Sequence, residues 1–308
     1  MSYCIDKRVT IFVTDKLPTR MTAETFSGLW FIHEPFALRM QSIVLPRLAA
    51  GKDPIPGHFK LRTQISAIDE NGNLDINRYY LRDALRQGGG DVAVIEIEGT
   101  MSRYGYCGYG NERIVGILKA AEAEPQVKAV VLKMDTPGGT VDSTDILADA
   151  VARFSKPIIA WTNFCASAGY FVASQADQIV MENSIASEVG SIGVLMVYVD
   201  QSEALEKEGL KVTIYRADAS VDKARINGLE PLTNELEAEI RASLNEASRA
   251  FNGYVRRGRA GKLKGDAVLT GKMYNKRQAL KEGLVDKLGS LDDAIAMARK
   301  LAALDTGA

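Results

Sequence analysis

From residue 92 onward, short apolar runs alternate with longer stretches whose apolar residues recur at helical spacing. The β-branched apolar runs predict strands at residues 92–97, 129–134, 157–162, 178–181 and 211–215. Helical spacing predicts helices at residues 112–123, 143–154, 168–175, 233–257 and 291–303. Strands that alternate with helices need crossover connections, so we expect an α/β fold with a largely parallel sheet.

Three consecutive glycines at residues 88–90 interrupt the chain just before the first predicted strand. Their backbone has high conformational freedom and they offer no side chain to pack, so we place a domain boundary there. Residues 1–90 mix apolar segments with a polar run that reaches residue 86, and we expect an appendage with a role in assembly or substrate handling. Residues 91–308 then form the main domain, C-terminal helices included.

The composition of the 308 residues, 46% hydrophobic and 25% charged, is that of a globular protein. With 38 basic and 39 acidic residues the net charge is −1, so no field attracts nucleic acid or an anionic membrane. No apolar stretch reaches the roughly 18 residues that a membrane span needs, and the N-terminus lacks a secretory signal pattern. We therefore expect a cytoplasmic protein with neither nucleic acid nor a membrane span among its partners.

The cysteines, Cys4, Cys107 and Cys165, are odd in number and widely spaced. This usage fits a reducing compartment and matches no metal-binding arrangement. The glycines at 105, 108 and 110 also differ in order from a dinucleotide-binding motif. We expect no metal and no cofactor.

Two glycine-containing stretches follow predicted strands. Ser167 opens the stretch Ser167-Ala168-Gly169-Tyr170 at a strand-to-helix turn, where outward-pointing amides stabilise negative charge. Gly138 and Gly139 follow the strand at 129–134, and their amides would lie at the carboxyl edge of the sheet, where α/β folds bind ligands. A serine nucleophile beside an oxyanion-binding turn is one interpretation. A helix cap and an ordinary turn are the others.

A serine nucleophile needs a base, which is usually histidine. The two histidines, His33 and His58, both precede the glycine break, so the main domain cannot hold a Ser-His-Asp triad. A lysine can serve instead if its surroundings lower its pKa toward neutrality. Lys223 follows the predicted strand at 211–215, although spacing alone does not distinguish it from other lysines.

Taken together, these stretches resemble the signal peptide peptidase A (SppA) family of serine peptidases. The resemblance covers roughly residues 91–303. It rests on residues 135–139, 166–170, 189–194, Lys223, 255–259, 271–274 and 283–289, in that order.

The resemblance implies the fold of Clp protease and the crotonases, with ββα units around a mixed, largely parallel sheet. It implies Ser167 as nucleophile, Lys223 as general base and Ser191 as the serine that orients the lysine amine. The oxyanion hole would comprise the amides of Ala168 and of Gly138 or Gly139. At two positions the chain departs from the family: Ala168 stands where a glycine is usual, and Asp222 stands where a histidine commonly precedes the lysine.

The family also implies a homo-oligomer, often a ring, in which one dyad takes its serine and lysine from neighbouring subunits. Residues 29–38 resemble the N-terminal segment of phage and prophage members that cleave scaffold and capsid proteins. We therefore expect a capsid-maturation endopeptidase acting in the host cytoplasm or the prohead. The alternatives are a soluble bacterial peptidase that degrades signal peptides or proteins, an acyl-CoA enzyme of the crotonase type, and an inactive assembly scaffold.

Overall fold

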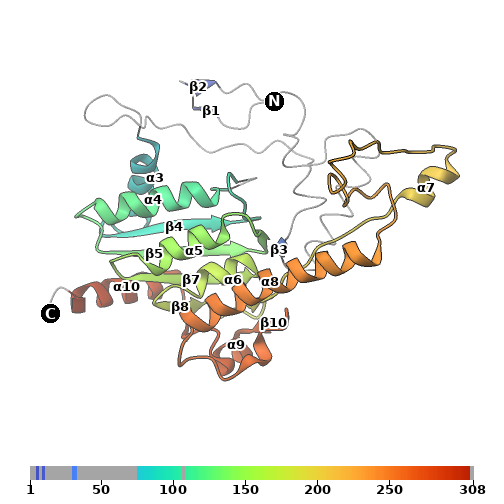
Figure 1. Ribbon diagram of the computed structural model, residues 1–308. Coiled ribbons are helices and arrows are strands. Elements are labelled where there is room, and N and C mark those ends of the chain that lie inside the picture. Colours follow the sequence, from blue (N-terminus) through green and yellow to red (C-terminus); the bar gives the residue numbers. More distant parts are fainter. Residues whose placement is uncertain (1–4, 7–8, 11–29, 33–74, 106–107, 306–308) are drawn as a thin grey trace.

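The computed structural model describes residues 5–6, 9–10, 30–32, 75–105 and 108–305, and its centre is a seven-stranded sheet (Figure 1). Five strands run parallel to one another: β4 (Val92–Glu98), β5 (Ala129–Thr136), β7 (Ile158–Ala166), β8 (Gln178–Met181) and β9 (Glu188–Gly190). Two short strands complete the sheet: β10 (Met273–Asn275), antiparallel to β9, and β11 (Lys287–Leu288), parallel to β8. The predicted α/β class with a mixed, largely parallel sheet is confirmed.

Strand β7 is the branch point of this sheet. Along one edge it pairs with β5, and along the other it pairs first with β8 and then with β9. The last partners in the β7–β9 register are Ala166 and Gly190. The segments that follow these two strands therefore begin side by side at the carboxyl edge of the sheet.

Helices cover both faces of the sheet (Figure 1). One layer contains α3 (Ile76–Gln87), α4 (Asn111–Ala123), α5 (Thr144–Ala152) and α6 (Ala168–Ala173). The other face carries α10 (Leu291–Asp305). Burial of both faces explains why the strands read as continuous apolar runs, since in β4 Ile95 packs into the larger core and Val94 into the smaller core beneath α10.

Helix α8 (Asn234–Gly258) reaches beyond this layered core (Figure 1). Its C-terminal end packs on α6, with the rings of Phe251 and Tyr254 centred 4.9 and 4.5 Å from that of Phe171. Its N-terminal end projects outward and connects to the segment that contains α7 (Ser202–Lys207). We call residues 195–233 the arm.

The remaining elements are short. A strand β6 (Gly138–Thr140) pairs with β3 (Trp30–Ile32), and β1 (Ile5–Asp6) pairs with β2 (Val9–Thr10). A 3₁₀ helix spans Asp266–Val268, and α9 (Lys276–Glu282) follows β10.

All predicted strands but one, and all predicted helices, are confirmed, and apart from the strand at 178–181 their ends shift. The exception is residues 211–215, which form no strand. In the described chain no neighbouring strand pairs with this segment, and Val212 and Tyr215 are 45% and 92% exposed. The β-branched apolar run alone was therefore insufficient, because a strand needs a hydrogen-bonding partner.

Helix α3 lies within the polar run, where no helix was expected. The Asp75 carboxylate begins it by accepting the amides of Asn77 and Arg78 at 3.1 and 3.0 Å. Its Leu81 and Leu85 are buried in the larger core. The last residues before the glycine break thus share a core with the main domain, and a division at residue 90 stays a prediction.

Candidate active site

Ser167 forms the whole turn between β7, which ends at Ala166, and α6, which begins at Ala168. Its backbone has φ 54° and ψ −116°. Such a conformation in a residue with a side chain costs on the order of 1–3 kcal/mol and needs support from its surroundings. The Ser167 amide donates to the Gly190 carbonyl at 2.8 Å, which ties the strained turn to the end of β9.

The Ser167 side chain does not cap α6, so the simple capping interpretation is wrong. Its Oγ instead lies 3.5 Å from the Gly193 carbonyl, at the upper limit for a hydrogen bond. The residue is fully buried. A strained serine that leaves a strand for a buried helix is the geometry by which many α/β hydrolases present a nucleophile.

Ser191 occupies the equivalent position after β9. Its φ is 52°, and its amide donates to the Lys272 carbonyl at 2.9 Å. Because Ala166 and Gly190 are paired, Ser167 and Ser191 leave neighbouring strands together. The structure thus brings these two predicted site residues to one place.

Gly138 and Gly139 lie in β6, directly after β5. The β5–β7 register shifts just before this point, since Met134 pairs with Thr162 and Asp135 with Phe164, which leaves Asn163 of β7 as the extra residue. Gly138 has a φ of 94°, where glycine is favoured, and a side chain on Gly139 would meet the Met101 carbonyl at 1.8 Å. Both glycines are therefore required by the backbone.

Thr136 distinguishes the two glycine amides. Its hydroxyl accepts the Gly138 amide at 3.1 Å and donates to the Gly99 carbonyl at 2.6 Å. The amide of Gly138 is thus bound within its own turn, whereas the backbone groups of Gly139 face β3. The bond to Gly138 is local, but the Thr136 hydroxyl also donates to the distant Gly99 carbonyl, a contact that the spacing of the glycines does not reveal.

The same threonine also lies against the start of α6, just after Ser167. A Cβ on Gly169 would lie 2.5 Å from Thr136 Cγ2, so only glycine allows this approach of α6 to β5. Ala168, whose amide is the other predicted oxyanion donor, is fully buried in the first turn of α6. Its amide is among those that a helix N-terminus leaves without an intrahelical partner. No motif in the sequence marks Thr136 as the residue that contacts both Gly138 and the start of α6.

Lys223 lies apart from this group, in the arm. It is exposed, whereas Ser167 is buried. Its amide donates to the Ser220 carbonyl at 3.0 Å, and its carbonyl accepts from Arg216 at 2.6 Å. The carboxylate of the adjacent Asp222 pairs with Arg225 at 3.3 Å.

The arm is fixed to the projecting half of α8. Arg225 pairs with Glu239 at 3.0 Å. Residues 239 and 251 are about 18 Å apart along a helix, and Phe251 is the residue that packs on α6. No hydrogen bond joins Lys223 to Ser167 in the part of the chain that the structure describes, and the predicted dyad stays a prediction.

Other candidates near the serine have structural roles. Burial raises the pKa of the Cys165 thiol, and a neutral buried thiol fits the small hydrophobic residue expected there. Within the described ranges no cluster of His, Cys, Asp and Glu side chains could hold a metal ion. Both histidines, and Cys4 and Cys107, lie outside the described residues.

A largely parallel α/β sheet with a strained, buried serine at a strand-to-helix turn is compatible with a serine hydrolase. The sequence profile of Peptidase family S49 matches residues 150–305, just over half of the chain. The chain belongs to this family, which confirms the resemblance to SppA-type serine peptidases. The match includes Ser167, Ser191 and Lys223.

Protease 4 of Haemophilus influenzae is 26% identical over 219 residues, which are 68% of this chain and 34% of that protein. Capsid assembly protease C of Escherichia phage lambda is 28% identical over 264 residues, which are 82% of this chain and 57% of that protein. The chain therefore spans less than two thirds of the length of either relative.

Among solved structures, an enoyl-CoA hydratase/isomerase family member is 17% identical, with a TM-score of 0.42 over 69% of this chain and 74% of that one. The fold class of the present chain rests on its own sheet topology. None of the helices in the described ranges combines the length and apolar character that crossing a bilayer requires.

Proposed function

We propose that the chain is a serine endopeptidase in which Ser167 attacks the peptide carbonyl and Lys223 of a second copy accepts the serine proton. The observation that carries this proposal is the strained Ser167 turn, paired with Ser191 and adjacent to the glycines of β6, in a member of family S49. Strain at a buried hydroxyl is not needed for folding, and such strain clusters at functional sites.

The reaction then follows from these groups. The Ser167 Oγ–carbon bond forms while the Oγ proton passes to the amine of Lys223, and the amides of Gly139 and Ala168 hold the oxyanion. The carbon–nitrogen bond breaks, and the lysine gives its proton to the leaving amine. Water then adds to the acyl-enzyme, the lysine takes its proton, and the proton returns to Ser167 as the acyl–oxygen bond breaks.

A second copy is the source of the lysine in this proposal because the arm exposes apolar side chains. Tyr215 is 92% exposed, Val221 66% and Leu210 54%. Exposed apolar residues gathered on one projecting segment are typical of a surface that another protein covers. A neighbouring chain could also supply the strand partner that residues 211–215 lack. We expect a homo-oligomer, and a ring if each arm reaches the next copy.

The proposed substrates are phage capsid and scaffold proteins, cleaved in the host cytoplasm or the prohead. Similarity to the lambda protease supports this choice over a bacterial housekeeping peptidase, because it covers 82% of the chain and so reaches into the first 90 residues. Similarity to protease 4 covers 68%. The N-terminal appendage is then the part related to assembly or substrate.

Co-expression of the chain with the capsid or scaffold protein of its own genome tests the substrate proposal. Mass spectrometry should find cuts in that protein which are absent with Ser167→Ala. Intact capsid protein, combined with Ser167-dependent cleavage of unrelated unfolded proteins, would favour a general peptidase instead. Intact proteins throughout and no labelling of Ser167 would favour an inactive scaffold.

A further inference from the structure

Strand β6, which carries the proposed oxyanion glycine, has two edges with different partners. On one edge, the Met101 amide donates to the Gly138 carbonyl at 2.8 Å and the Thr140 amide donates to the Met101 carbonyl at 3.0 Å. In a strand, the backbone amide and carbonyl groups of successive residues point to opposite edges. The groups of Gly139 therefore point away from Met101. That opposite edge is where β3 pairs.

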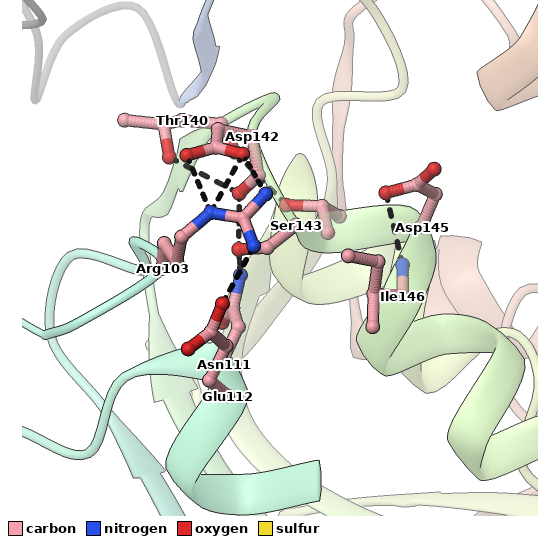
Figure 2. Close-up of polar contacts among 9 residues, drawn as sticks. Arg103, Asn111, Glu112, Thr140, Asp142, Ser143, Asp145 and Ile146 are labelled. Carbon is pink, nitrogen blue, oxygen red and sulfur yellow. Dashed lines mark hydrogen bonds and ion pairs between the residues drawn. The ribbon is translucent and has the colours of Figure 1, made fainter.

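The Met101 edge is held firmly by charged side chains (Figure 2). Arg103 Nε lies 3.0 Å from both carboxylate oxygens of Asp142, and Arg103 Nη1 lies 2.6 Å from Glu112. Asn111 donates to the Ser143 hydroxyl at 3.0 Å. These contacts join the segment after β4, the start of α4 and the segment after β6, so this edge does not exchange partners easily.

The opposite edge carries only a short strand from a distant part of the sequence. The antiparallel register places Phe31 opposite Gly139 and Ile32 opposite Gly138. Since Gly139 directs its amide and carbonyl toward β3, Phe31 is the residue whose backbone groups it meets. A three-residue strand contributes few hydrogen bonds, each of which adds little net free energy.

We propose that this outer edge of β6 is where the backbone of an extended polypeptide substrate adds as an antiparallel strand, and that Trp30–Ile32 of the chain itself competes for it. Strand addition to a free edge binds peptides through their backbone, largely independently of sequence. The inference rests on the proposed function, because it takes Gly139 as an oxyanion donor. A substrate carbonyl bound to the Gly139 amide would take the place of Phe31.

Burial at the site agrees with an occupied edge. Ser167 is fully buried, and both glycines of β6 are buried as well. A polypeptide cannot reach the serine until some part of the chain moves. Release of β3 would free the edge. Substrate binds only the fraction of chains whose edge is free, so its apparent affinity falls in proportion to that fraction.

Two proline substitutions in β3 separate pairing from other effects. Phe31→Pro removes an amide that faces β6, whereas Ile32→Pro removes one that faces away and leaves Phe31 in the extended region. Both are made in the full chain with Ser167→Ala, so that no cleavage occurs. The probe is a fluorescein-labelled peptide of residues 27–35, which includes the natural β3 sequence.

Fluorescence anisotropy should give about tenfold tighter binding of this peptide to the Phe31→Pro chain than to the Ile32→Pro chain, the effect of one or two net hydrogen bonds. Equal affinity for both variants, or no measurable binding to either, would overturn the inference. If Phe31→Pro fails to fold, the same peptide added to the chain with native β3 should slow labelling of Ser167 by a fluorophosphonate, and unchanged labelling would overturn the inference.

The two proposals fail differently. Absence of Ser167-dependent labelling in the unaltered chain contradicts the proposed peptidase. Suppose that labelling depends on Ser167 but the peptide binds the Phe31→Pro and Ile32→Pro chains equally. This result contradicts only the competition by β3.

Discussion

Ser167 and Ser191 leave neighbouring parallel strands one residue after a paired position, and both have left-handed φ angles, of 54° and 52°. The amide of Ser167 is bound by the carbonyl of Gly190, the residue just before Ser191. The two turns therefore support one another. Each places a hydroxyl-bearing residue in a conformation that most side chains disfavour, and this shared strain has measurable consequences.

Glycine at position 167 should relieve backbone strain that alanine retains. We expect Ser167→Gly to be more stable than Ser167→Ala by about 1 kcal/mol, since strain of roughly 1–3 kcal/mol is partly offset by the greater freedom of glycine in the unfolded chain. Urea unfolding of the two variants measures the difference. A Ser167→Gly variant less stable than Ser167→Ala would argue that the turn is unstrained.

The hydroxyl of Ser191 should matter for the rate more than for substrate binding. We expect Ser191→Ala to lower kcat about tenfold or more with little change in KM. It should also shift the acidic limb of the pH–rate profile, where the lysine base loses its proton, because the Ser191 hydroxyl is proposed to orient the lysine amine. Ser191→Gly, which removes the same hydroxyl but relieves the φ angle, should behave alike in kcat. A pH profile identical to that of the unaltered chain in both variants would contradict a positioning role.

Thr136 should couple the oxyanion strand to catalysis. Thr136→Val keeps the shape but removes the hydroxyl that binds the Gly138 amide and the Gly99 carbonyl, so we expect a loss of about 1–3 kcal/mol in stability. Misplacement of the neighbouring Gly139 amide should lower kcat by up to about a hundredfold. The matched control is Thr162→Val, at an equally buried position in β7, for which kcat should be retained. Equal kcat losses in the two variants would show that the Thr136 hydroxyl does not position the Gly139 amide.

Asp286 should make stability depend on pH in the acid range. Its burial opposes ionisation, but hydrogen bonds and charge from the buried Arg259 outweigh that effect and lower the pKa of the carboxyl. A lowered folded pKa stabilises the native state fully above the unfolded value of about 3.9, and this stabilisation is lost as the pH falls through the folded pKa. Denaturant unfolding between about pH 2 and 7 measures the loss.

The variant Asp286→Asn leaves Arg259 buried without its charged partner. We expect about 3–5 kcal/mol lower stability at neutral pH and a flatter acid limb. An acid limb as steep as that of the unaltered chain would mean that other carboxylates dominate.

A shared dyad predicts complementation between inactive chains. Ser167→Ala and Lys223→Ala should each be inactive alone, and mixing them under conditions that allow subunit exchange should restore part of the activity. The control, Lys211→Ala, alters another exposed lysine of the arm and should keep full activity. A mixture as inactive as its components would place serine and lysine in the same chain.

The pattern of the sequence predicts the sheet well because its strands are buried on both faces. β4, β5 and β7 read as apolar runs for that reason, and Ser167 was found because it directly follows such a run. The family resemblance, not spacing, selected Lys223 and Ser191. Those assignments remain predictions about the working enzyme.

What the sequence could not predict depends on contacts between distant segments. The bond from the Thr136 hydroxyl to the Gly99 carbonyl and the pairing of Phe31 with Gly139 each join parts of the chain that no local pattern relates. The prediction of a strand at residues 211–215 was wrong for a similar reason, since β-branched apolar residues favour a strand but do not supply its partner. The Asp75 cap of α3 was a local signal, and it was readable in the sequence.

Covalent labelling shows whether Ser167 is a nucleophile. The full chain is treated with a fluorophosphonate, digested and analysed by mass spectrometry. We predict a single modified serine, Ser167, with no labelling in Ser167→Ala and slower labelling in Lys223→Ala. Modification of another serine, or equal labelling of Ser167→Ala and the unaltered chain, would contradict it.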